Sequence, residues 1–213
     1  MKRLLVLDMD GTVLAENSWQ SLHEAFGLRA EEDAVMLEWY RQGILSYADW
    51  TRLIEKIYVQ RGLATRQRAV TALYGCRIRD GARELVDGAR RRGYDIALIS
   101  GGVSLLVERV AHELGIDHWS ANHRLRFDDD GRFIALDMKG DDAEFKAAEL
   151  AALCGRLKLP SSDCYCIGNG CNDRLVFELS GHGILVCDAD KPRPFSGAWN
   201  EVRELAEALS VLP

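Results

Sequence analysis

Residues 2–12 read KRLLVLDMDGT, and this stretch decides the fold that the sequence predicts. Its apolar residues follow one another without polar alternation, which is typical of a parallel strand buried on both faces. Asp8 and Asp10 end the apolar run too early for a signal peptide. The sequence therefore predicts a buried first strand, at residues 2–7, with two carboxylates at its end.

Helices and strands alternate in the predicted structure from Gly81 onwards. Helices are expected at 82–92, 103–114, 142–157, 172–179 and 201–209, strands at 94–100, 164–167 and 183–186, and a hairpin at 124–133. Such alternation indicates an α/β fold with a Rossmann-like, doubly wound parallel sheet and right-handed crossovers. The first strand belongs to this same sheet.

Residues 17–75 have a different pattern, with apolar residues at helical spacing and no convincing strand. Four helices are expected there: one that ends at Gly27, and three at 30–42, 46–60 and 65–74. The sequence therefore predicts two parts. Residues 1–13 and 78–213 form the Rossmann-like core, and residues 14–77 form an inserted helical cap domain.

Composition excludes several classes of protein. The 213 residues include 27 Lys and Arg against 33 Asp and Glu, a net charge of −6, which argues against a nucleic-acid partner. No run of eighteen apolar residues exists, so no membrane span is expected. The six cysteines form no C-x-x-C pair and are expected to be free thiols, which indicates a cytoplasmic location.

Two carboxylates follow the first strand. Because residues i and i+2 of an extended chain project to the same face, Asp8 and Asp10 are expected to point together. Paired carboxylates repel unless a cation separates them or one is protonated, and Mg²⁺ is a cation that takes oxygen ligands. Gly11 permits a sharp turn directly afterwards. The simpler interpretation is a solvated turn after a core strand.

Polar residues also follow two later strands. Ser100, Gly101 and the next glycine precede a helix, so a hydroxyl and a helix N-terminus could bind an anion, although Ser-Gly-Gly is also a common helix cap. Residues 168–173 read GNGCND and offer two amides and a carboxylate for a metal or phosphate, or an ordinary Asn/Gly turn. Lys146 lies in a predicted helix, where most lysines are exposed.

Taken together, these segments resemble the haloacid dehalogenase-like superfamily, and within it the phosphoserine-phosphatase-like branch. The four family motifs are matched in order by DMDGT, LISGG, Lys146 and GNGCND, and the predicted cap occupies the place of that branch's cap domain. Further likeness lies at residues 114–117, at Ala121 and Asn122, and at Lys191 and Pro192. The resemblance covers nearly the whole chain.

The resemblance implies a Mg²⁺-dependent phosphatase that hydrolyses a small phosphomonoester. Asp8 would be the nucleophile that forms an aspartyl-phosphate, and Asp10 the acid and base, with its backbone carbonyl on Mg²⁺. Ser100 and the Gly101 N–H would hold phosphoryl oxygens, and Lys146 would neutralise charge.

The remaining residues implied by the resemblance bind phosphate or metal. Gly11, Thr12 and Asn172 would contact phosphate or substrate. Asn169 and Asp173 would join Asp8 and Asp10 at the metal. Asn169 departs from the family pattern, which has aspartate there, so weaker metal binding or a larger role for Asp173 is expected.

Two positions concern the rest of the substrate. Asn17 stands where phosphoserine phosphatases have the glutamate that meets the substrate ammonium, whereas Arg52 is expected to match the arginine that grips the carboxylate. Two alternatives to a phosphatase stay open. One is a phosphotransferase that uses the same intermediate, and the other is a degenerate phosphate-binding regulatory protein.

Overall fold

The computed structural model describes residues 2–187, 194, 195, 197 and 199–213. A seven-stranded sheet runs in the order β4-β3-β2-β1-β5-β6-β7. Its strands are β1 (Arg3–Leu7), β2 (Tyr94–Val103), β3 (His118–Phe127), β4 (Phe133–Met138), β5 (Cys164–Gly168), β6 (Gly183–Val186) and β7 (Asn200–Val202). Every neighbouring pair is parallel except β3 and β4. The predicted α/β class is confirmed, with an antiparallel edge strand added.

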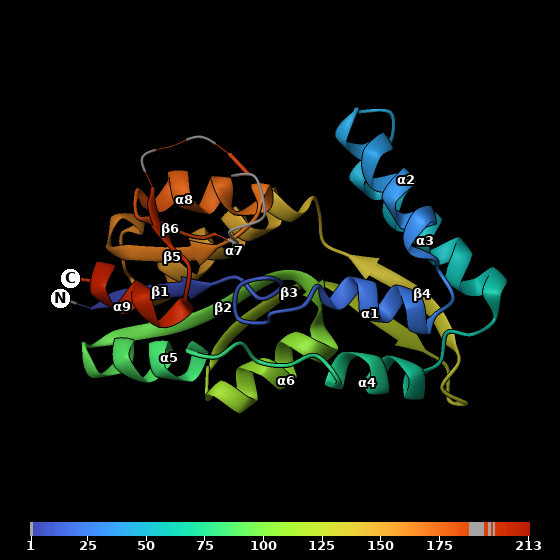
Figure 1. Cartoon of the computed structure of the whole chain (residues 1–213), viewed down its shortest axis with the longest axis horizontal. Coiled ribbons are helices and arrows are strands. Elements are labelled where there is room, and N and C mark those ends of the chain that lie inside the picture. The colour runs from blue at the N-terminus through green and yellow to red at the C-terminus, as the bar shows by residue number, and fades with distance from the viewer. Residues whose placement is uncertain (1, 188–193, 196, 198) are drawn as a thin grey trace.

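Helices cover both faces of this sheet (Figure 1). Helices α5 (Ala82–Arg91) and α6 (Ser104–Leu114) lie on one face, and α7 (Asp142–Leu157) and α8 (Arg174–Ser180) on the other. Leu5 and Leu7 of β1 belong to the first core, whereas Leu4 and Val6 belong to the second. Both faces of β1 are buried, which explains its unbroken apolar sequence.

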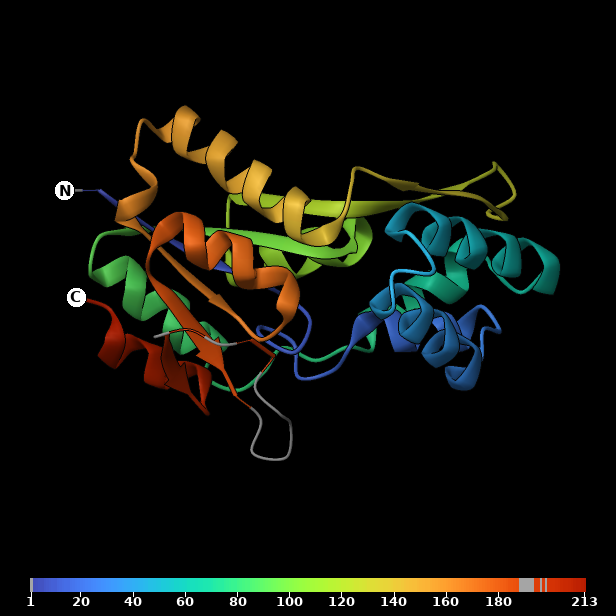
Figure 2. The same cartoon turned by 90° about the horizontal axis from the view of Figure 1, so that it is seen from above.

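Four further helices form the N-terminal insert: α1 (Ser18–Ala25), α2 (Ala30–Arg41), α3 (Tyr47–Arg61) and α4 (Arg66–Tyr74). They lie together at one end of the molecule (Figure 2). Asn17, Ser46 and Thr65 cap α1, α3 and α4 by accepting backbone N–H bonds, which explains why these helices begin where they do. The expected helical insert is confirmed.

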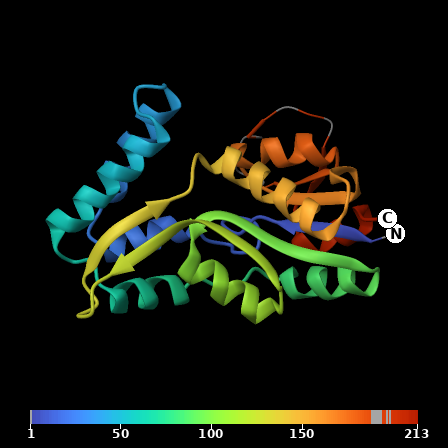
Figure 3. The same ribbon diagram turned by 180° about the vertical axis from the view of Figure 1, so that it is seen from behind.

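The β3–β4 hairpin projects from the core and packs against the insert (Figure 3). The amide of Phe133 donates to the Ala64 carbonyl at 3.1 Å, and the amide of Arg66 donates to the Gly131 carbonyl at 2.7 Å. The hairpin expected at 124–133 is therefore present but extends over 118–138. Domain boundaries at residues 14 and 77 stay a prediction.

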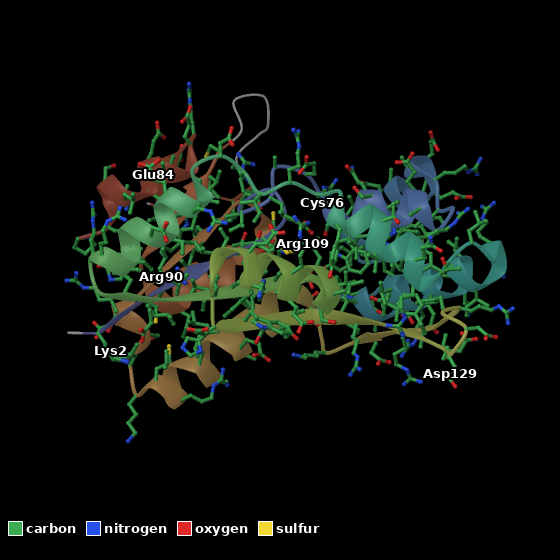
Figure 4. All side chains as sticks on the ribbon, turned by 90° about the horizontal axis from the view of Figure 1, so that it is seen from below. Lys2, Cys76, Glu84, Arg90, Arg109 and Asp129 are labelled. Carbon is green, nitrogen blue, oxygen red and sulfur yellow. The ribbon has the colours of Figure 1, made fainter. Side chains whose placement is uncertain are left out.

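Arg109 of α6 binds the segment through which the chain leaves the helical insert and returns to the core. Its Nη1 donates to the carbonyls of Leu73, Tyr74 and Cys76 at the end of α4, at 3.3, 3.4 and 2.9 Å. Figure 4 shows Arg109 beside Cys76, with Asp129 far away at the tip of the hairpin.

The helix predicted at 201–209 is wrong. β7 occupies the sheet edge there, and the short 3-10 helix η3 (Leu205–Glu207) and α9 (Ala208–Val211) follow. Parallel pairing of β7 with β6, continued by a 2.9 Å bond from the Cys187 amide to the Val202 carbonyl, outweighs the local helical pattern. Two other 3-10 turns, η1 (Ser161–Asp163) and η2 (Cys171–Asp173), flank β5, so α8 begins two residues later than the helix predicted at 172.

Two expectations from composition can be compared with the structure. All six cysteines are free, as predicted. Across the part of the chain that the structure describes, no helix has the length and apolar character needed to cross a membrane.

Candidate active site

The carboxylate of Asp8 lies at the end of β1, beside the loop that follows β5. Its backbone amide donates to the Ile167 carbonyl at 2.9 Å, which extends the pairing of β1 with β5 by one residue. The residue is only 7% exposed. Burial and the neighbouring Asp173 raise the pKa of Asp8 to about 7, although Lys146 acts in the opposite direction.

Lys146 is not an exposed helix lysine, since it is 1% exposed. Its Nζ donates to Asp8 Oδ1 and to Asp173 Oδ1, each at 2.6 Å. Burial by itself would lower the pKa of Lys146, but the two carboxylates outweigh burial and raise it. A charged ammonium therefore joins two acids from different strand ends, and stabilises the ionised form of Asp8.

Asp173 organises the loop after β5. Its Oδ2 accepts the amides of Asn169 and Gly170, both at 3.0 Å, while Oδ1 accepts from Lys146. A Cβ on Gly168 would lie 2.3 Å from the Asp173 carboxyl carbon, so only glycine fits there. Both oxygens of Asp173 are already used, which suits it to positioning rather than to direct metal binding.

Oxygen atoms of Asp8 and Asn169 converge near Thr12. The Thr12 hydroxyl lies 3.3 Å from Asp8 Oδ2 and 3.4 Å from Asn169 Oδ1. Gly11, at φ +72°, closes the same corner, because a Cβ there would lie 2.0 Å from the Asn169 amide nitrogen. Carboxylate and amide oxygens are ligands that Mg²⁺ accepts, so these residues fit that ion.

The described residues contain no cluster of three or more His, Cys, Asp or Glu side chains arranged for a metal. Magnesium at this corner would depend on Asp8, Asn169 and backbone carbonyls rather than on a ring of carboxylates.

Asp10 contacts the helical insert directly. Its Oδ1 accepts the Ser18 amide at 3.0 Å, and its Oδ2 accepts the Ser18 hydroxyl at 2.8 Å. Burial raises the pKa of Asp10 to about 6, while the two Ser18 bonds lower it. A carboxyl that titrates close to neutral pH can both donate and accept a proton. Sequence analysis missed Ser18, although it stands next to Asn17.

The turn after β2 meets the same edge of the sheet. Ser100 is buried, and its hydroxyl accepts the Gly102 amide at 3.0 Å. A Cβ on Gly102 would lie 3.7 Å from Asp10 Oδ2, and one on Gly101 would lie 2.4 Å from Asp142 Oδ2. The Asp142 carboxylate, which sequence analysis also missed, therefore lies directly against Gly101.

A cavity of about 180 Å³ adjoins this edge, between α1, α2, α3 and the hairpin. Asn17 and Asp142 line it, so the structure places Asn17 at this cavity. Arg52 is not in the cavity lining. Its side chain is 69% exposed, and its Nη1 pairs with Asp49 Oδ1 at 2.7 Å.

The structure thus brings together most of the residues that the sequence singled out. Asp8, Thr12, Lys146, Asn169 and Asp173 are linked through the hydrogen bonds given above, and Ser100 and Asp10 both lie beside Gly102. Asn172 is half-buried beside Gly170, with its Oδ1 2.6 Å from where a Gly170 Cβ would lie. Lys191 and Pro192, which also carry the family resemblance, lie outside the described residues.

Comparison with known proteins gives the same assignment. The family model for haloacid dehalogenase-like hydrolases matches residues 5–178. The chain is 30% identical over 191 residues to a phosphoserine phosphatase of Streptococcus thermophilus, covering 88% of this chain and 85% of that protein. It is 29% identical over 190 residues to a phosphoserine phosphatase of Archaeoglobus fulgidus, covering 86% of this chain but 52%, about half, of that protein.

A solved structure described as a phospho-aspartyl intermediate analogue of phosphoserine phosphatase has the same fold. The TM-score is 0.76 at 24% identity, over 100% of this chain and 99% of that one. The chain therefore belongs to the haloacid dehalogenase-like hydrolase family, in its phosphoserine-phosphatase-like branch. The resemblance inferred from the four motifs is confirmed.

Proposed function

We propose that this protein hydrolyses a small phosphomonoester through an aspartyl-phosphate on Asp8. The observation that carries this proposal is the buried chain of Asp8, Lys146 and Asp173 beside Asp10. Family membership supports the same chemistry, because relatives of this branch are phosphoserine phosphatases. The cytoplasmic location is part of the proposal and agrees with the free thiols.

The first step is attack of an Asp8 carboxylate oxygen on phosphorus. As that bond forms, the bond from phosphorus to the leaving alcohol oxygen breaks, and Asp10 donates its proton to the leaving oxygen. Ser18 holds Asp10 in place through two hydrogen bonds. Lys146, which is 1% exposed, balances negative charge at Asp8.

The second step releases phosphate. Asp10, now ionised, accepts a proton from a water molecule that attacks the phosphorus. The bond between phosphorus and Asp8 breaks, which restores the Asp8 carboxylate and yields inorganic phosphate. Ser100, Gly101 and Asn172 are the groups proposed to hold the phosphoryl oxygens through both steps. Ser100 and Gly101 directly precede Gly102, which lies beside Asp10, and Asn172 lies beside Gly170 in the loop after β5.

Magnesium is the proposed cofactor, with Asp8, Asn169 and the Asp10 carbonyl as the residues that would hold it. When bound, it would neutralise negative charge on the phosphoryl oxygens. Asp173 would act one contact away, because its oxygens are taken by Lys146 and the loop amides.

Phosphate release from a panel of phosphomonoesters, with Mg²⁺ and then with a chelator, tests this proposal. We expect Asp8→Asn to lose activity by on the order of a thousandfold or more, while Asp49→Asn, at an exposed carboxylate, stays near the wild type. Near-normal turnover by Asp8→Asn would overturn the nucleophile assignment. A new phosphoester formed in the presence of added alcohols would indicate a phosphotransferase. No release with any metal would indicate a phosphate-binding protein.

A further inference from the structure

The cavity beside the reaction centre is placed to receive the part of the substrate that leaves with the alcohol. Asp142 connects the two regions, because its carboxylate lines the cavity and lies against Gly101. Asn17 lines the same cavity and precedes Ser18, which holds Asp10. A phosphomonoester with its phosphate between Asp8 and Gly101 would therefore extend its alcohol portion into this space.

The charges that line the cavity have one sign. Asp33 and Asp142 are carboxylates, and no Lys or Arg is among the described lining residues. His23 also lines the cavity, but burial lowers its pKa to about 4, so it is uncharged at neutral pH. Arg52 pairs with Asp49 on the exposed side of α3. The described lining of the cavity thus offers no cation to a substrate that carries a carboxylate.

Asp33 lacks a partner for one of its oxygens. Its Oδ1 is buried and has no hydrogen-bond partner among the described residues. The ring nitrogen Nε2 of the neutral His23 imidazole lies 3.5 Å from this oxygen, which is longer than an ordinary N–H···O hydrogen bond. A buried carboxylate oxygen without a donor at hydrogen-bond distance is costly, and a cationic group that binds in the cavity would supply the missing interaction.

Aromatic rings complete the lining. Trp19, Tyr47, Trp50 and His123 all border the cavity. Tyr47 and Trp50 stand at 82° with centroids 6.0 Å apart, and Trp19 and His123 stand at 87° with centroids 4.9 Å apart. Rings at right angles present π faces in different directions. Such an enclosure favours a cation, above all an alkylated ammonium.

We propose that the substrate is the phosphate ester of an amino alcohol without a carboxylate, whose ammonium group binds between Asp33 and the aromatic rings of this cavity. The proposal rests on the proposed phosphatase function and specifies its substrate. It separates this chain from the phosphoserine phosphatases to which it is similar. Phosphoserine carries both an ammonium and a carboxylate, and only the ammonium finds a counterpart here.

Turnover of isosteric esters measures the contribution of charge. We expect the kcat/KM for phosphocholine or phosphoethanolamine to exceed that for 3,3-dimethylbutyl phosphate, the neutral carbon analogue of phosphocholine, by roughly tenfold or more. O-phosphoserine should be a poorer substrate than phosphoethanolamine. Equal rates for the charged and neutral esters would overturn the proposal.

Substitutions of single residues test which side chain produces the preference for the charged ester. Asp33→Asn should lower the preference for the charged ester over its neutral analogue by about tenfold. Glu31→Gln removes the same charge from an exposed position of the same helix and should leave the preference unaltered. Arg52→Ala should also leave it unaltered. A loss of phosphoserine turnover in Arg52→Ala would contradict the proposal.

Calorimetric titration with choline and with 3,3-dimethyl-1-butanol adds a readout that does not need turnover. We expect choline to bind more tightly than its neutral analogue, and Asp33→Asn to remove the difference. Hydrolysis of p-nitrophenyl phosphate checks the chemistry separately. If p-nitrophenyl phosphate is hydrolysed but the charged and neutral esters are turned over equally well, only the substrate proposal fails. If no ester is hydrolysed, the phosphatase proposal fails, and the choline titration still decides whether the cavity binds a cation.

Discussion

The reaction centre and the neighbouring cavity treat their polar groups in opposite ways. At the reaction centre, Lys146 joins Asp8 and Asp173 at 2.6 Å each, so buried charge is matched by buried charge. In the cavity, Asp33 Oδ1 and the Trp50 ring nitrogen are buried without hydrogen-bond partners among the described residues. The reaction centre is organised before substrate arrives, whereas the cavity leaves interactions for the substrate to complete.

Lys146→Met should have the largest effect of the substitutions considered, because it disrupts the charge pairing at the reaction centre. Without the ammonium, Asp8 and Asp173 become buried acids with no compensating charge, which costs roughly 3–5 kcal/mol in the free energy of unfolding. We expect turnover to fall by on the order of a thousandfold as well. Urea unfolding and steady-state kinetics measure both effects.

An exposed ion pair supplies the control for that experiment. Lys2 pairs with Asp95 at 3.3 Å, but the lysine side chain is 67% exposed. Lys2→Met should therefore change the free energy of unfolding by less than about 1 kcal/mol. Similar losses of unfolding free energy in Lys2→Met and Lys146→Met would show that the buried pairing of Lys146 with Asp8 and Asp173 is no more stabilising than an exposed ion pair.

Protonation of His23 should disturb the cavity. Burial lowers its pKa from 6.5 to about 4, so below pH 6.5 the unfolded chain binds a proton that the folded chain rejects. The contribution of His23 to the free energy of unfolding is therefore complete above pH 6.5. It should decline by up to about 3 kcal/mol as the pH falls towards 4.

The comparison of wild type with His23→Gln isolates this effect, since Asp8 and Asp10 titrate in both proteins. Chemical unfolding from pH 7.5 to pH 4 should show a steeper decline for the wild type. Parallel curves for the two proteins would show that His23 is already protonated or does not titrate in this range.

A glycine pair gives the smallest expected effect. Gly11 and Gly62 have similar positive φ angles, +72° and +65°, but a Cβ on Gly11 would collide with Asn169 while one on Gly62 meets open space. Gly62→Ala should cost about 1 kcal/mol in the free energy of unfolding and leave the Mg²⁺ requirement unchanged. Gly11→Ala should cost about 2 kcal/mol and raise the Mg²⁺ concentration needed for half-maximal activity. If Gly11→Ala and Gly62→Ala need the same Mg²⁺ concentration for half-maximal activity, Asn169 does not take part in metal binding.

Sequence reasoning predicted the reaction centre better than the cavity. The i and i+2 spacing of Asp8 and Asp10, and the rule that parallel strands end at one edge, bring three polar segments together before any coordinates are known. Arg52, in contrast, is expected at the site only because it resembles the cap arginine of the family. Its outward direction depends on how α3 packs on the hairpin, where Glu55 accepts the Leu136 amide at 2.8 Å.

Three polar side chains beside the site were not predicted: Ser18, Asp33 and Asp142. Each lies in a helix or its first turn, where a serine or an acidic residue has an ordinary local explanation as a cap or a dipole partner. Local sequence cannot separate these explanations from a place beside a cavity. The closing segment is similar, because the helical pattern at 201–209 yields to strand pairing with β6.

The sequence by itself determined the α/β class, the insertion of helices after β1 and the family motifs, because these follow from local periodicity and short-range geometry. Only the tertiary structure decided that Lys146 is buried between two carboxylates, that Arg52 faces outward, and that Asp33 borders a cavity whose described lining holds no Lys or Arg. These outcomes depend on which distant segments pack together. Burial and charge pairing are properties of that packing and are absent from any single stretch of chain.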